Sequence, residues 1–180
     1  MIQEEFIEKI KTNLSKNCCL SINERVFPVI INMIMRIIFL YIDASSKLAK
    51  HCDRDIILLK DIHLVQDFIE NQYIIISTEV HKDIHQKIDQ GYKNFEYTPM
   101  EHTGGGNKKS LNKYISSKDF KKLCNENLKN MSIDARASNK ILENINEFLD
   151  SFLNQCKKHC SQKKTNQLEE NDVVYIMSQD

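Results

Sequence analysis

Two long segments of the sequence carry apolar residues at every third or fourth position, and neither can bury its apolar stripe alone. The first follows Ser21 and runs to about Lys50, and the second runs from about Ser132 to Cys160. A helix of about 28 residues is roughly 42 Å long, so a partner of similar length must cross it to cover the stripe. We therefore expect the two segments to bury their stripes against each other. The stripe positions are Val26, Ile30, Met33, Ile37, Tyr41, Ala44 and Leu48 in the first segment, and Ile141, Ile145, Phe148, Leu149, Phe152, Leu153 and Cys156 in the second.

Shorter predicted helices flank each long segment, so that both halves of the chain repeat the order short, long, short. In the N-terminal half, the short helices are expected over residues 2–14 and from Leu59 past Phe68. In the C-terminal half, they are expected over residues 116–127 and 169–178. The chain has four glycines and two prolines, and this scarcity of helix breakers predicts an all-α fold.

Local polar motifs set the expected boundaries of these helices. Ser21-Ile-Asn-Glu24 and Ser116-Ser-Lys-Asp119 resemble capping boxes, in which a hydroxyl and a carboxylate bond to free N–H groups at a helix start. Polar breaks at Cys52–Asp55 and Ser161–Gln167 end the two long helices, and the three glycines within Thr103–Asn107 indicate a flexible joint. The expected domains are residues 1–72, a partly helical linker over 73–109, and residues 110–180.

The most apolar part of the chain, Val26 to Ile42, resembles a membrane span in composition. It is only 17 residues long, with Pro28 near its start and Arg36 in the middle. A buried helix of a soluble protein is the better interpretation. Glutamate and lysine residues among the first twenty positions argue against a signal peptide, so we expect a protein that is not secreted and whose six cysteines are reduced.

Other chemistry finds little support in the sequence. Cys156, His159 and Cys160 could supply three zinc ligands, but the two cysteines continue the apolar stripe and no fourth ligand has a suitable spacing. The glycines at 104–106 precede Asn-Lys-Lys-Ser110, without the strand and glycine spacing of a phosphate-binding loop. No nucleophile with an adjacent base is recognisable. We therefore expect no metal, no cofactor and no enzymatic activity.

The order of short, long and short helices with two polar loops resembles the histone fold, and short motifs strengthen the resemblance. In the C-terminal half, Asp172-Val-Val-Tyr175, Phe120-Lys-Lys-Leu123 and His159 resemble the type-four core histone. In the N-terminal half, Lys60-Asp-Ile-His-Leu64 and Lys11-Thr-Asn-Leu14 resemble the type-three core histone. The similarity covers residues 2–71 and 115–178.

This resemblance implies a histone doublet of the kind known among giant DNA viruses. Such a chain would hold two tandem histone folds that pair within the molecule in a handshake. It would bind and package double-stranded DNA in nucleosome-like or tetramer-like particles, through phosphate contacts without sequence specificity. Its place would be a virion or virus factory, or otherwise the nucleus or another DNA-containing compartment.

Histone pairs bind phosphates with paired loops and helix N-termini, so the resemblance also implies which residues contact DNA. Arg54 stands out because it lies in a loop beside a helix that matches the family. The expected DNA-binding residues are Lys16, Arg54, Lys121, Lys122, Lys129, Lys163 and Lys164. Lys108, Lys109 and Lys113 could add phosphate contacts from the linker.

Contacts between protein molecules follow from the same resemblance. His51 and Asp61 fall where two type-three copies meet in the family, so they are expected to pair across a two-fold axis. Leu64 and Phe68 would lie beside them, and an Asp61→Lys substitution would prevent this self-association. The expected contacts with a second histone pair or doublet are His159 and Tyr175.

Several features depart from the family pattern. Asn130 stands in place of a minor-groove arginine, and Gln66 and Asp67 replace arginines of the type-three histone. The 25 Lys and Arg residues balance 25 Asp and Glu residues, whereas a free nucleic-acid-binding protein is usually basic. DNA binding therefore requires lysines gathered on the loops and acids on the outer faces. The neutral charge favours the alternative, a histone-fold protein–protein assembly module, like subunit pairs of transcription factors, with little DNA affinity.

Overall fold

The structure, a computed structural model, describes residues 2–71 and 113–177, and this part of the chain is mostly helical. The helices are α1 (Ile2–Asn17), α2 (Val26–His51), α3 (Leu59–Asn71), α5 (Ser117–Asn127), α6 (Ala135–Gln162) and α7 (Glu170–Met177). The strands have two residues each: β1 (Ser21–Ile22), β2 (Ile56–Ile57), β3 (Ser132–Ile133) and β4 (Gln167–Leu168). The expectation of an all-α fold is confirmed, and the linker expected over 73–109 lies outside the described residues.

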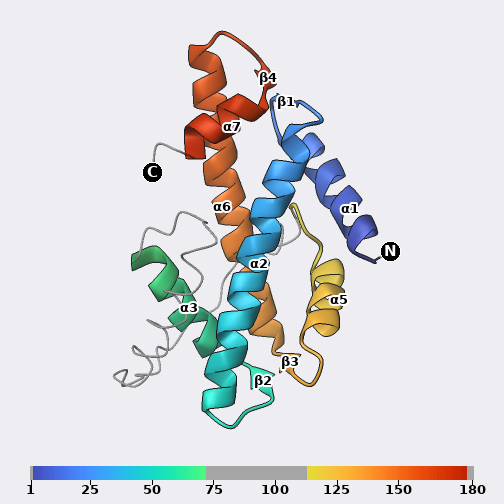
Figure 1. Ribbon diagram of the computed structural model, residues 1–180, viewed down its shortest axis with the longest axis vertical. Helices are drawn as coiled ribbons and strands as arrows, with labels where there is room; N and C mark the ends of the chain where they lie inside the picture. The colour runs from blue at the N-terminus through green and yellow to red at the C-terminus, as the bar shows by residue number, and fades with distance from the viewer. Residues whose placement is uncertain (1, 72–112, 178–180) are drawn as a thin grey trace.

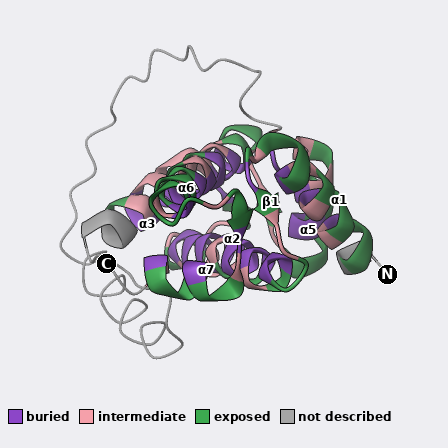
Figure 2. Cartoon of the chain, turned by 90° about the horizontal axis from the view of Figure 1, so that it is seen from above, coloured by how far each residue is buried: buried purple, intermediate pink, exposed green. Residues whose placement is uncertain are grey.

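The two long helices α2 and α6 run in opposite directions and cross near the middle of the molecule (Figure 1). Helix α3 packs on both of them, while α1 and α5 lie together on the opposite side of the crossing. Buried residues line the inner sides of the helices, and exposed residues cover the outside (Figure 2). The two long helices contact each other where they cross, as expected, but the short helices also cover their stripes: α1, α3 and α7 contact α2, and α3, α5 and α7 contact α6.

Each end of the crossing is closed by a short parallel strand pair that takes one strand from each half of the chain. At one end, Ser21 and Ile22 of β1 pair with Gln167 and Leu168 of β4. At the other end, β2 pairs with β3 in the same way. We refer to these as the β1/β4 end and the β2/β3 end, each consisting of the strand pair with its adjoining loops and helix termini. Every loop next to a long helix is therefore held by the other half.

The two halves repeat the same backbone plan with an offset of 111 residues. Ser21 corresponds to Ser132 and Ile56 to Gln167, because these residues occupy equivalent places in the two strand pairs. The loop after each long helix also has one residue in the left-handed region, Asp53 with φ 51° and its equivalent Lys164 with φ 56°. The repeat allows each residue at one end to be compared with its counterpart at the other.

The expected helix starts are correct in one case and wrong in another. Ser116 accepts a hydrogen bond from the N–H of Asp119 and donates one to its carboxylate, as the capping box predicted. The second capping box is wrong, because Ser21 belongs to β1 and α2 begins only at Val26, with no side-chain cap. Helix α6 likewise begins after Ser132, and its N-cap is Asp134. In both loops the serine pairs with the other half, and α6 keeps a local cap, in which Asp134 accepts the N–H of Arg136.

Helix α2 is long and apolar enough, by length and composition alone, to cross a membrane. In the structure, 61% of its most apolar stretch is buried inside the protein. Ile30, Ile34 and Ile38 are fully buried in a core shared with α3 and α6. The apolar composition of α2 therefore matches its central place in the core.

Candidate nucleic-acid interface

The cations expected to contact DNA divide between the two ends of the molecule and the face between them. Lys163 and Lys164 follow α6 at the β1/β4 end, and Lys16 lies in the last turn of α1, which leads into β1. Arg54 and Lys129 lie at the β2/β3 end. The expected residues of α5, Lys121 and Lys122, are exposed on the face between the ends. Lys108 and Lys109 lie outside the described residues.

Arg54 is bound inside the molecule by a buried carboxylate. Its Nη2 lies 2.7 Å from Asp61 Oδ1, and its Nη1 donates to Asp61 Oδ2 at 2.9 Å and to the carbonyl of Ile56 at 3.0 Å. Asp61 is 1% exposed and also accepts the N–H of Leu58. The hydrogen bonds with Asp61 raise the pKa of Arg54 above its already high ordinary value. Arg54 therefore holds the loop onto α3, and a DNA phosphate would have to compete with Asp61 for it.

A second buried carboxylate, Asp172, occupies the equivalent position at the β1/β4 end. It is 2% exposed, accepts the N–H of Glu169 at 3.0 Å, and lies 3.1 Å from His159 Nε2. Lys163 donates to the same carboxylate, but 49% of the lysine side chain is exposed. Unlike Arg54, Lys163 keeps enough exposed surface to meet a phosphate while it stays beside its internal partner.

The carboxyl groups of Asp119 and Asp172 titrate below their ordinary range. Burial raises the pKa of Asp172, but the bonds from Lys163, the Glu169 N–H and His159 outweigh it, and the net shift is downward. The bonds from Ser116 and Lys9 lower the pKa of Asp119. Both groups therefore stabilise the fold above the ordinary carboxyl pKa of 3.8, and this stabilisation is lost as the pH falls through the lower folded value.

This linkage predicts how an Asp172→Asn variant responds to acid. Above pH 5 the variant should be less stable than the wild type, because asparagine cannot form the ion pair with Lys163. Below the ordinary carboxyl pKa the difference should shrink, because the wild-type carboxylate becomes protonated while asparagine does not titrate. Urea unfolding followed by circular dichroism between pH 6 and pH 3 measures both curves. A difference that stays constant over this range would contradict the prediction.

The face between the two ends is less suited to phosphate than the resemblance implied. Helices α1 and α5 pack side by side there, and Glu4 and Glu5 lie in the first turn of α1. In α5, Asp119 occupies the first turn and accepts a bond of 2.9 Å from Lys9. Helix N-termini attract anions, but carboxylates already occupy both of these. The carboxylates make the N-termini of α1 and α5 less favourable for phosphate, and contact of Lys121 and Lys122 with DNA stays a prediction.

Lys113, the linker lysine that the structure describes, is tied into the core. It forms an ion pair with Asp150 of α6, and Tyr114 donates to the same carboxylate at 2.6 Å. Asn17 of α1 reaches the carbonyl of Lys113 at 3.1 Å. These contacts fasten the chain before α5 to α1 and α6, so Lys113 serves as an anchor in this structure.

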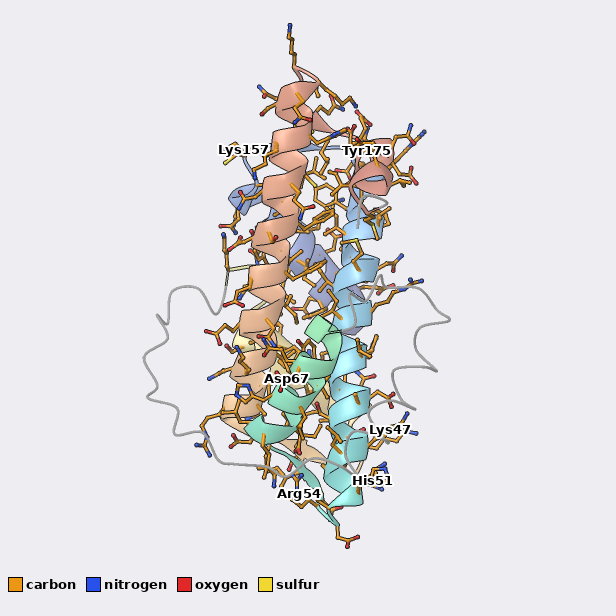
Figure 3. The ribbon with its side chains drawn as sticks, turned by 90° about the vertical axis from the view of Figure 1, so that its left-hand side faces the viewer. Lys47, His51, Arg54, Asp67, Lys157 and Tyr175 are labelled. Atoms are coloured by element: carbon orange, nitrogen blue, oxygen red, sulfur yellow. The ribbon has the colours of Figure 1, made fainter. Side chains whose placement is uncertain are left out.

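The residues expected to join two copies of the chain differ in their exposure. His51 is exposed at the end of α2, near Arg54 (Figure 3). Asp61 and Leu64 are buried within the chain, where Asp61 binds Arg54, and the pairing of Asp61 with a second copy stays a prediction. The side chain of Phe68 lies outside the described residues. An Asp61→Lys substitution would place a lysine against Arg54, and would disturb the fold whether or not copies associate.

Tyr175, expected with His159 to meet a second histone pair, lies toward the opposite end of the molecule from His51 and Arg54 (Figure 3). The ring of His159 stacks on that of Tyr175 with centroids 4.8 Å apart. Tyr175 and its neighbour Val174 are 49% and 57% exposed, although both are apolar and belong to α7. The ring of His159 thus lies between Tyr175, on which it stacks, and the carboxylate of Asp172, which its Nε2 contacts. About half of Tyr175 therefore faces solvent beside the ring of His159.

Three of the six cysteines are core residues, whereas Cys19 is exposed and Cys18 and Cys52 are partly buried. All six are free thiols, and Cys124, Cys156 and Cys160 are buried. Burial raises the pKa of Cys124 and of Cys156 to about 12, which keeps both thiols protonated at neutral pH. No group of residues suited to a metal ion is found among the described residues. His159, the third ligand considered from sequence, is directed to Asp172.

Two features of the β1/β4 end were missed from the sequence. Arg25 is exposed at the start of α2, close to β1, and it is a further cation that was not among the DNA-binding residues expected from the sequence. Asn23 donates to Glu169 at 2.7 Å and links the two halves at this end. Arg25 could have been found from its place next to the first loop, whereas the bond between Asn23 and Glu169 has no local signal.

Comparisons with known proteins add no relative. No protein-family model matches the chain, and no curated protein sequence matches it significantly. The assignment of a function therefore depends on the residues and the geometry described above.

Proposed function

We propose that this chain is a histone doublet that binds and packages double-stranded DNA without sequence specificity. One observation carries the proposal: α2 and α6 cross in opposite directions, and each end of the crossing is closed by one loop from each half. This is the arrangement expected of two histone folds paired in a handshake. The motifs that resemble the type-three and type-four histones favour a doublet like those of giant DNA viruses, acting in a virion, a virus factory or another DNA-containing compartment.

The exposed cations of the loops and helix termini support contact with the phosphate backbone. Lys16, Lys164 and half-exposed Lys163 could each neutralise a phosphate. Such contacts release counterions, so affinity falls steeply with salt. With a formal net charge of zero, no long-range attraction of the whole molecule adds to these local contacts.

We expect the full chain to bind a short DNA duplex at low salt, with an affinity that depends little on base sequence. If three lysines each neutralise one phosphate, affinity should fall about 40-fold between 50 and 200 mM salt. Fluorescence anisotropy with two duplexes of equal length and unrelated sequence measures both properties. The absence of binding even at 50 mM salt would reject the proposal. If the chain binds, nuclease digestion of the complex distinguishes wrapping, which protects a discrete fragment, from loose coating, which does not.

A second candidate function is a histone-fold assembly module with little DNA affinity. The exposed apolar pair Val174 and Tyr175 favours it, because exposed apolar side chains on one helix suit a contact with another protein. The neutral charge favours it as well. Weak or absent DNA binding, combined with self-association in light scattering, would support this module. Self-association through the first fold stays a prediction under either function.

A further inference from the structure

The two ends of the molecule share one backbone design, so differences between them come from side chains. Each has a parallel strand pair, a loop residue in the left-handed region, and a buried aspartate at the start of the following helix. Asp53 and Lys164 are the equivalent left-handed residues, and Asp61 and Asp172 are the equivalent aspartates. The β2/β3 end therefore provides a control for the β1/β4 end within one protein.

The loops that follow the long helices carry opposite charges at equivalent positions. Lys164 at the β1/β4 end corresponds to Asp53 at the β2/β3 end, and both residues are exposed. Arg54, whose counterpart is the neutral Thr165, is bound to Asp61. The next acid is Asp55, whose counterpart is the neutral Asn166. Lys163 corresponds to the uncharged Cys52. A phosphate approaching the tip of the loop meets lysines at one end and carboxylates at the other.

The surroundings strengthen this difference at the β1/β4 end. Lys16 and Arg25 are exposed there and add positive charge beside the loop. Two acids of the same end have cationic or amide partners, since Glu24 pairs with Lys11 at 2.7 Å and Glu169 accepts from Asn23. A third acid, Glu170, is exposed in the first turn of α7. Phosphates at this end would therefore meet a locally positive surface on a neutral chain.

The cations of the β2/β3 end are placed less favourably for DNA. Arg54 is committed to Asp61 and only 18% of its side chain is exposed. Arg136, the counterpart of Arg25, is 80% exposed at this end and lies 3.5 Å from Asp134.

Lys129 lines a groove of about 550 Å³ together with a second cation, Lys50, and the carboxylates of Asp43 and Asp55. Exposed charges act on one another over about 8 Å at physiological salt, so carboxylates on the same groove oppose a phosphate near Lys129.

We infer, on the basis of the proposed DNA-binding function, that the chain holds duplex phosphates through the β1/β4 end in preference to the β2/β3 end, whose loop tip carries carboxylates. A single molecule then grips the duplex at one end of its long axis, and Lys164 at the tip of the loop is the central contact. DNA that follows the whole length of the particle would require a second copy or a partner to supply further contacts.

A charge exchange at the two equivalent loop positions tests this inference. Lys164→Asp and Asp53→Lys each introduce a residue type that the other end already holds in the same backbone conformation, so both variants should keep the fold. Loss of one phosphate contact lowers affinity about 8-fold at 0.1 M salt, and Lys164→Asp should weaken duplex binding by at least this factor. Asp53→Lys should strengthen binding, because it creates a positive loop at the other end.

Two neutral variants, Lys164→Gln and Lys129→Gln, complete the experiment, with thermal unfolding to confirm that each is folded. Lys164→Gln should reduce the slope of affinity against salt by about one, and Lys129→Gln should change it little. If the wild type binds and the two variants lose affinity equally, the inference is overturned while the proposed function stands. If the wild type does not bind DNA at low salt, the proposed function fails and the inference fails with it.

Discussion

Separated from each other, the two halves of the chain are expected to lose their helical structure, and to recover it when they are mixed. Each strand pair takes one strand from each half, so neither pair can form in a single half. Ile57 and Leu168 are fully buried at these pairs and would meet water. Helix α3 also packs on α6, and α7 packs on α2. The last helix of each half therefore depends on the long helix of the other half.

The size of this effect follows from the apolar surface that separation exposes. Exposing one large apolar side chain costs about 1.5–3 kcal/mol, while a whole domain is stable by about 5–15 kcal/mol. Exposure of about five core side chains is therefore enough to unfold either half. Chains of this length also bury too little surface to offset such a loss.

Residues 1–72 and 110–180, prepared as separate peptides, provide the measurement. Circular dichroism should show low helix content in each peptide and a cooperative thermal transition only in the equimolar mixture. A full chain cut at a protease site inserted within residues 73–109 is the matched control, and it should keep its helices. A single peptide that unfolds cooperatively with full helix content would show that the halves are independent domains.

The sequence predicted the helices well because their signal is local. Apolar residues three and four positions apart place a stripe on one side of a helix, and buried Ile141, Ile145 and Leu149 follow this rule in α6. The crossing of the long helices followed from the length of their stripes, and the short helices followed from polar motifs at their boundaries. Net charge gave no such guidance, because a total of zero does not say where lysines and carboxylates gather.

Features that depend on distant residues could not be predicted in the same way. Ser21 looks like a helix cap in its local sequence, but its N–H donates to the carbonyl of Asn166 at 2.9 Å, and this fixes it in a strand. Arg54 looks like a free loop cation, although Asp61 binds it from the next helix. In both cases a contact that local sequence does not reveal decides the role of a residue.

Removal of the carboxylate at Asp61 is expected to be among the most damaging single substitutions in the described part of the chain. In an Asp61→Ala variant, the Arg54 guanidinium and the Leu58 N–H lose their acceptor in a site where Asp61 is almost inaccessible to water. Breaking a buried ion pair by removing one partner costs about 3–5 kcal/mol. Urea unfolding of the full chain at neutral pH measures the loss.

The equivalent aspartate at the other end makes a matched comparison. Asp172→Ala removes the same kind of acceptor at the same place in the repeat, but Lys163 is half exposed and can return to water. We therefore expect this variant to lose less stability than Asp61→Ala. A loss at Asp172 equal to or larger than that at Asp61 would contradict the argument, because it would mean that exposure of the cation does not control the cost.

A double substitution separates the cost of an unpaired charge from the value of the pair. Replacing both Arg54 and Asp61 by leucine leaves no buried charge, and apolar replacements of buried ion pairs are often neutral or stabilising. The double variant should therefore recover much of the stability lost in Asp61→Ala. Recovery would mean that Arg54 acts mainly by neutralising Asp61 inside the fold. DNA affinity of the recovered variant should then equal that of the wild type, since neither residue is expected to meet phosphate.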